Sequence, residues 1–206
     1  SQHKAAEVNL VQVCVGGLDN SVCFVFDTFK NPSILNGTGA HCLKTLFEGS
    51  AHKVLHCCYG DSSALLQYGI KVKNVFDTSV ADSLILCRHF NSPRDLGTVL
   101  KHHLGEETVH LSHKGKLHFT PRMFQERPLP NHLFVYSFED VLYCNLLYAA
   151  QRARLEALGL LELTLSLSQQ RAVPSYSTAP QITLQIALVD ASGVACLRDH
   201  LNQCRL

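Results

Sequence analysis

The sequence predicts one α/β domain over residues 1–206, in which helices flank a mixed sheet of five or six strands. Its composition supplies the material for a buried core, because 46% of the 206 residues are hydrophobic and 17% are charged. Short β-branched apolar runs alternate with segments of helical spacing, and the first four predicted elements follow in the order strand, strand, helix, strand. The same composition excludes a disordered chain.

The first two strands are predicted to form a β-hairpin. Residues 8–15 (VNLVQVCV) and 22–29 (VCFVFDTF) are rich in β-branched and aromatic side chains, and GGLDN between them is typical of a turn. The run HCLKTLF, residues 41–47, has helical spacing. KVLHCC, which begins at Lys53, predicts a short buried strand.

Aspartates stand at the starts of the next two predicted helices. Asp61 lies in the first turn of DSSALLQYG, and Gly69 is expected just past the end of that helix. Asp77 precedes TSVADSLILC and is the predicted N-cap of the second helix.

Three predicted segments follow. Ser92 and Pro93 begin a helix, because the fixed φ and missing N–H of proline are tolerated at the first helical position. Residues 106–130 are polar, and little regular structure is expected there. A long helix is predicted over residues 131–158, with Gly159 ending it.

Residues 159–206 are predicted to form a strand pair and a closing helix. LELTLSLS and QITLQIALVD both alternate with period two, which is typical of strands, and the Pro/Ser-rich VPSYSTAP separates them. The segment VACLRDHLNQC predicts the helix. This C-terminal part is a candidate to complete the central sheet.

The charge, the cysteine content and the lack of a long apolar run indicate which partners and which cellular compartment are expected. A formal net charge of +1 means that any nucleic-acid binding depends on a local groove and not on overall basicity. Nine cysteines and the starting segment SQHKAAEVNLVQV favour a reducing, cytoplasmic compartment. No apolar run approaches the roughly 18 to 20 residues that cross a bilayer, so no membrane partner is expected.

Two other kinds of site are disfavoured. The chain has no C-x-x-C pair, and Cys57 and Cys58 are adjacent on a predicted strand, so their side chains diverge. The same divergence argues against a cysteine nucleophile beside His56. The histidines and lysines of residues 101–122 are expected to add to a weakly basic surface that contacts phosphates.

Tyr136 and Asp140 lie four residues apart on the predicted long helix, which places them on one face. Taken alone, the spacing of this pair is typical of a surface helix with a half-buried tyrosine. The position of Asp61, taken alone, is typical of a residue that caps a helix. The surrounding sequence gives the three residues a shared interpretation.

Three stretches carry a family resemblance that covers roughly residues 8–148: KVLHCCYGDSSALLQYGIKVKNVFDTSVAD, HLGEETVHLSHKGKLHFTPRMFQERPLP and YSFEDVLYCNLLY. They resemble the ribonuclease D-like 3'–5' exonucleases, the tyrosine-containing branch of the DEDD superfamily. The most similar branch is the animal exonuclease-domain-like proteins of germline small-RNA pathways. The resemblance implies a ribonuclease H-like fold, with its mixed central sheet flanked by helices.

The resemblance also implies roles for individual residues. Asp61 falls on the second-motif aspartate of the family, and Tyr136 and Asp140 fall on its third-motif tyrosine and aspartate. Asp27 matches the third strand of the family and is not a catalytic position. In such enzymes carboxylates hold two Mg²⁺ or Mn²⁺ ions about 3.5–4 Å apart, and the tyrosine orients the attacking water.

The first motif of the family, Asp-x-Glu on the central strand, is missing before residue 8. We hypothesise that residues 182–190 fill the central position, with Asp190 as the aspartate and Ser192 where the glutamate belongs. The predicted catalytic residues are then Asp61, Tyr136, Asp140 and Asp190, of which the three aspartates are the predicted metal ligands. Because the serine hydroxyl is a poor magnesium ligand, the second ion would be loosely held.

Two functions remain open at this point. The first is a domain that binds single-stranded RNA with weak or absent hydrolysis, and recruits protein partners or forms a homodimer. The second is an active metal-dependent 3'–5' exoribonuclease whose first-motif carboxylates come from another segment. A module that binds only proteins is a third reading, which a complete lack of RNA affinity would favour.

Overall fold

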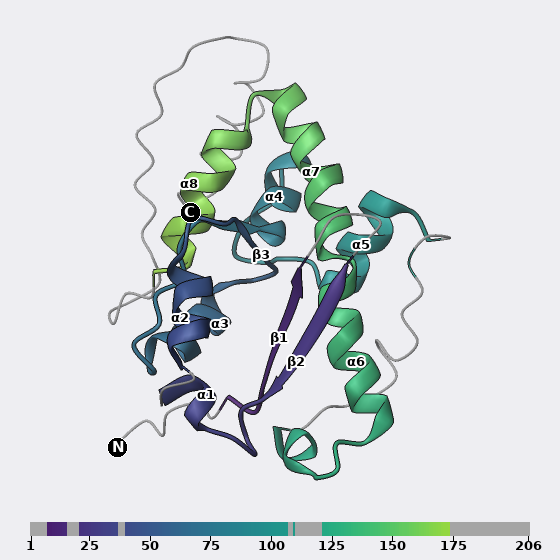
Figure 1. The fold of residues 1–206 in the computed structure, drawn as a ribbon. Helices are drawn as coiled ribbons and strands as arrows, with labels where there is room; N and C mark the ends of the chain where they lie inside the picture. The colour runs from purple at the N-terminus through teal and green to yellow at the C-terminus, as the bar shows by residue number, and fades with distance from the viewer. Residues whose placement is uncertain (1–7, 16–20, 37–39, 107–108, 110–120, 174–206) are drawn as a thin grey trace.

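The computed structural model describes residues 8–15, 21–36, 40–106, 109 and 121–173. These residues form four short strands and a larger set of helices (Figure 1). In chain order the elements are β1 (Leu10–Val15), β2 (Val22–Asp27), α1 (Ser33–Asn36), α2 (Ala40–Glu48), β3 (Lys53–Leu55), α3 (Tyr59–Leu66), β4 (Val75–Asp77), α4 (Thr78–Ile85), α5 (Leu96–Leu104), η1 (Pro121–Gln125), α6 (Asn131–Leu142), α7 (Cys144–Leu158) and α8 (Leu161–Arg171). None of these helices is long and apolar enough to cross a membrane.

The strands form two separate two-stranded sheets. β1 and β2 make the predicted antiparallel hairpin, with Leu10 opposite Asp27 and Val15 opposite Val22. β3 and β4 pair in parallel, with Lys53 opposite Val75. Within the described residues the two pairs are not hydrogen-bonded to each other. The strand content is therefore mixed, as predicted, but the sheet is split.

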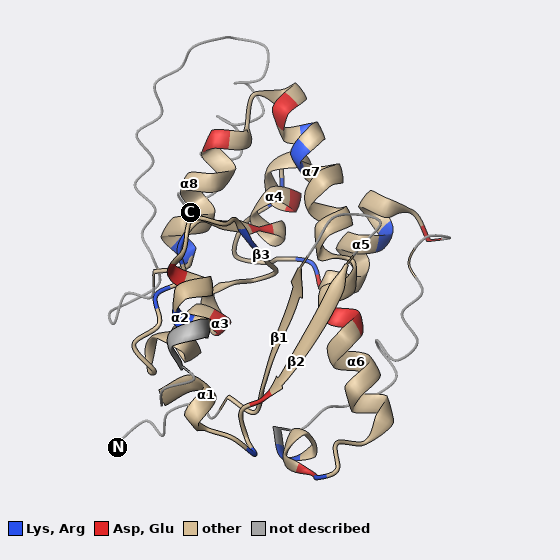
Figure 2. Ribbon diagram, in the orientation of Figure 1, with Lys and Arg blue, Asp and Glu red and all other residues tan. Residues whose placement is uncertain are grey.

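Helices surround both strand pairs. Figure 1 shows α6 along one side of the hairpin and α2 and α3 on its other side, and α6 contacts both hairpin strands. Around the parallel pair, α8 packs on β4, and α4 packs on α7 and α8. Phe76 of β4 is fully buried there, edge-on to Tyr148 with ring centroids 4.8 Å apart. Figure 2 shows that charged residues stand mostly on the helices and loops around the hairpin.

Asp77 caps α4, as the sequence predicts. Its fully buried carboxylate accepts hydrogen bonds from the backbone N–H of Ser79 (2.9 Å) and from the Ser79 hydroxyl (2.7 Å). It also accepts bonds from the backbone N–H groups of Cys57 and Cys58, both at 3.0 Å. The carboxylate therefore joins the start of α4 to the turn that follows β3, where Cys57 has the left-handed φ of 56°.

The helix predicted to start at Ser92 begins instead at Leu96. Asp95 is its N-cap, and its carboxylate accepts a hydrogen bond from the N–H of the third helical residue at 3.0 Å. Arg94 precedes the helix, and its Nε donates to the buried carboxylate of Asp82 at 2.9 Å. The local Ser-Pro signal could not reveal this long-range ion pair.

The helix predicted over residues 131–158 consists of two helices. α6 ends at Leu142 and α7 begins at Cys144, with Tyr143 at φ −90° and ψ −3° between them. α6 packs on the hairpin, whereas α7 packs on α4 and α5, so the two halves follow different surfaces. The predicted C-terminal stop is confirmed, since Gly159 ends α7 in the left-handed conformation with φ 68°.

The strand predicted for LELTLSLS is wrong, because these residues belong to helix α8. Its buried face consists of Thr164, Leu167 and Ser168, at helical spacing. The Ser168 hydroxyl accepts a hydrogen bond from the N–H of Asp77 at 2.9 Å, so a polar residue is buried with a partner. A period-two strand would place Thr164 and Ser168 on its solvent-facing side, whereas both are buried in the helix. The prediction was wrong because it treated these two polar residues as exposed. The predicted strand 182–190 and closing helix lie outside the described residues.

Replacing Asp77 by alanine is expected to lower the free energy of unfolding by about 3 kcal/mol. The change removes the cap of α4 and leaves two N–H groups after β3 without their acceptor. Urea denaturation monitored by circular dichroism measures the loss. Asp95→Ala is the matched control, because it removes the exposed cap of α5 alone, and about 1 kcal/mol is expected for it. Equal losses in the two variants would contradict the structural role given to Asp77.

Candidate functional site

A cavity of about 1090 Å³ lies between the hairpin and the parallel strand pair. All residues of β1 and all residues of β3 line it, so the two strands form facing walls. Three polar side chains reach the same cavity from two helices: Asp61 from α3, and Tyr136 and Asp140 from α6. The three residues that the sequence singled out, 75 to 79 positions apart along the chain for Asp61 and the α6 pair, therefore share one cavity.

The carboxyl group of Asp61 is electrostatically strained. Burial in the cavity wall, followed by the charges of Asp77 and Asp140, raises its pKa to about 6. The residue still has an exposed surface, because the cavity is open to solvent, while protein atoms surround the carboxyl group on the other sides. The negative charge of Asp140, which belongs to a distant part of the chain, therefore contributes to the raised pKa of Asp61.

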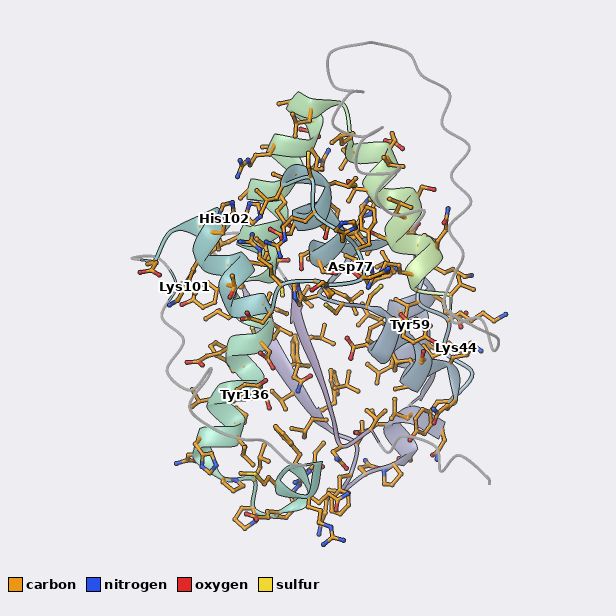
Figure 3. The ribbon with its side chains drawn as sticks, turned by 180° about the vertical axis from the view of Figure 1, so that it is seen from behind. Lys44, Tyr59, Asp77, Lys101, His102 and Tyr136 are labelled. Atoms are coloured by element: carbon orange, nitrogen blue, oxygen red, sulfur yellow. The ribbon has the colours of Figure 1, made fainter. Side chains whose placement is uncertain are left out.

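Tyr136 and Asp140 interact directly, as their spacing of one helical turn predicts. Burial, the charge of Asp140 and a hydrogen bond to its carboxylate raise the pKa of the Tyr136 phenol to about 12. The hydroxyl therefore keeps its proton at neutral pH. The ring also packs against Phe124, with centroids 6.2 Å apart. In Figure 3, Tyr136 on α6 and Tyr59 at the start of α3 lie on opposite sides of the hairpin strands.

The two other aspartates near the start of the domain have structural partners. Burial disfavours the charge of Asp77, but the hydrogen bonds from Ser79 and Cys58 outweigh it and lower the Asp77 pKa. Asp27 ends β2 and forms an ion pair with Arg127, which lowers its pKa. Asp27 does not line the cavity, in agreement with its non-catalytic assignment. Asp190 and Ser192 lie outside the described residues.

Asp61 and Asp140 are suitable in kind for a divalent cation. Carboxylate oxygens are the hard ligands that Mg²⁺ and Mn²⁺ prefer, and a cation between the two acids would remove the repulsion that raises the pKa of Asp61. In the described part of the chain, however, no group of three or more His, Cys, Asp or Glu side chains is placed to hold a metal ion. The described residues thus supply two carboxylates and one phenol.

The sequence did not identify His56 and Arg94 as residues of the cavity. His56 directly follows β3, and its ring nitrogens lie 2.8 Å from the Thr78 hydroxyl and 2.9 Å from the carbonyl oxygen of Arg94. Both residues line the cavity, and the Arg94 side chain also binds Asp82. Their positions depend on long-range contacts, so no local pattern could have found them.

The class of this α/β domain, with two acids and a tyrosine at one cavity, is shown by comparison with known families. The family described as 3'–5' exonuclease matches residues 2–156, well over half of the chain. The chain therefore belongs to the 3'–5' exonuclease family, and its fold is the ribonuclease H-like α/β fold of that family, as predicted. Members of the family typically use divalent metal ions. A search of curated proteins found no match.

Asp61→Asn is expected to stabilise the protein at pH 7 and to have no such effect below about pH 4. The folded-state pKa of about 6 lies above the ordinary aspartate value of 3.8, so the native state binds the extra proton and wild-type stability falls as pH rises between these values. Thermal unfolding between pH 4 and pH 8 should show a difference in Tm that opens over this interval. Glu156→Gln, on the exposed side of α7, is the control, and a difference independent of pH for Asp61→Asn would contradict the assignment.

Proposed function

We propose that this domain binds the 3' end of single-stranded RNA at the cavity and hydrolyses it weakly or not at all. The observation that carries the proposal is the convergence of Asp61, Tyr136 and Asp140 on one cavity in a chain of the 3'–5' exonuclease family. These residue types match the second and third acidic motifs of the resemblance. The cavity thus has the side chains that would contact a terminal phosphodiester.

A divalent ion, Mg²⁺ or Mn²⁺, is part of the proposal. Asp61 and Asp140 would hold it, and when bound it supplies positive charge that offsets the phosphate and lowers the pKa of a coordinated water. The remaining roles in the proposal belong to protein side chains. Tyr136 keeps its proton and offers a hydroxyl, whose hydrogen bond to the Asp140 side chain orients it.

Weak hydrolysis follows from the number of carboxylates. Two ions held by the protein need several hard oxygen ligands, and the described residues supply two carboxylates at this place. One ion can bind phosphate without completing the pair that steadies both the attacking and the leaving oxygen. A domain of this kind retains RNA better than it cleaves it.

The second candidate is an active 3'–5' exoribonuclease whose missing carboxylates come from another segment. The open space beside Asp61, between β1 and β3, favours it, because a further strand there could bring more acids to the cavity. We also propose that the chain belongs to the animal small-RNA branch of the family and is cytoplasmic. We further propose that it binds protein partners or forms a homodimer.

An assay on 5'-labelled single-stranded RNA with Mg²⁺ or Mn²⁺ tests the function. We expect retention of the RNA with little shortening, and weaker retention by Asp61→Ala and Asp140→Ala. Glu156→Ala removes an acid on α7 that does not line the cavity and is the control. Processive shortening that disappears in the two cavity variants and persists in Glu156→Ala would establish the second candidate. No RNA affinity at any salt concentration would favour a module that binds only proteins.

Binding of Mn²⁺ is expected to depend on Asp61. With two carboxylates we expect a dissociation constant on the order of a millimolar, typical of sites with few charged ligands. Titration of the full chain followed by the electron paramagnetic resonance of free Mn²⁺ measures it. Asp61→Ala should abolish the binding, whereas Tyr136→Phe should retain it, because the phenol is not needed as a ligand. Equal binding by wild type and Asp61→Ala would place the ion elsewhere.

A further inference from the structure

Each of the four described strands has one hydrogen-bonded neighbour, and two of them, β1 and β3, line the cavity. β1 is hydrogen-bonded to β2 only, and β3 is hydrogen-bonded to β4 only, among the residues described. A strand in the interior of a domain presents N–H and C=O groups on both edges, and leaving a buried edge unpaired is costly. The edges that lack a neighbour in β1 and β3 both border the same cavity.

The cavity has the character of a strand-binding slot. Apolar side chains of β1, β3, α2 and α3 line it, among them Val11, Val13, Leu55, Phe47 and Leu65. Its volume of about 1090 Å³ is far above that of a packing defect or a site for a few waters. A strand inserted there would lie about 4.8 Å from each neighbour and would join the two pairs into one mixed sheet.

We infer that residues 182–190, ITLQIALVD, insert as a strand between β1 and β3. The segment is longer than the six residues of β1 and the three of β3, and it contains neither proline nor glycine. Its apolar residues Ile182, Leu184, Ile186 and Leu188 fall on one face at period two, which suits the apolar wall of the cavity. Its only charged residue is Asp190, at the end.

The chain can reach the slot. The described C-terminal part ends at Val173, just after α8, and the neighbouring Ala172 is buried in one cluster with Val11 of β1 and Leu65 of α3. Both of these residues also line the cavity. Eight residues separate Val173 from Ile182, and an extended chain of that length spans roughly 28 Å.

Photo-crosslinking of the full chain tests the insertion. A photoreactive benzoylphenylalanine replaces Ile186, and mass spectrometry identifies its partners in an equal mixture of ¹⁴N- and ¹⁵N-labelled chains. We expect crosslinks to the peptides of β1 or β3 within one chain. The same probe at Ser177, in the Pro/Ser-rich segment, is the control and should not give them. Crosslinks between light and heavy chains would show that a second copy of the chain supplies the strand. Crosslinks to neither β1 nor β3 would show that residues 182–190 do not occupy the slot. Either result overturns the inference.

Hydrogen exchange gives an independent measurement. The amides of β1 and β3 should exchange at least about tenfold faster in Ile186→Pro than in wild type, because proline removes a ladder donor and is not tolerated inside a sheet. Ser177→Pro should cause no change, and unchanged protection of α4 shows that the variant is folded. Equal exchange in wild type and Ile186→Pro overturns the inference. Neither measurement involves RNA or metal, so each proposal can fail without the other.

Discussion

The buried carboxylate of Asp77 is the polar group that connects the parallel strands to the cavity. It stands at the end of β4, caps α4, and accepts the N–H groups of Cys57 and Cys58 in the turn after β3. That turn includes the left-handed Cys57, a conformation that costs on the order of 1–2 kcal/mol in a residue with a side chain. Because Asp77 holds the turn, α3 starts where Asp61 faces the cavity.

The same arrangement explains why Asp61 is electrostatically unfavourable in the folded protein. Hydrogen bonds stabilise the charge of Asp77, and that charge adds to burial, the main cause, in raising the pKa of Asp61. A domain selected for stability alone gains nothing from two acids converging on one cavity. Such stored repulsion is typical of sites where a cation or a positively charged group completes the arrangement. The divalent metal ions that the 3'–5' exonuclease family typically uses would offset such repulsion.

The split sheet and the acidic cavity are two aspects of one feature. The walls of the cavity are strand edges, and the acids stand at its polar end, so whatever pairs with β1 and β3 also approaches Asp61 and Asp140. This coupling follows from parallel strands, whose carboxyl ends gather at one edge of a sheet.

The sequence by itself determined the local elements and the family. The β-branched hairpin, the Asp77 cap, the stop at Gly159 and the Tyr136–Asp140 spacing all depend on interactions within a few residues, and the structure bears them out. Tertiary structure decided what depends on distant partners. Ser168 lies in a helix, where its hydroxyl accepts a hydrogen bond from the backbone N–H of Asp77, and Arg94 lies before α5, where its side chain binds Asp82. The cavity and the raised pKa of Asp61 likewise exist only once α3 and α6 face each other across β1, and no local pattern encodes that approach.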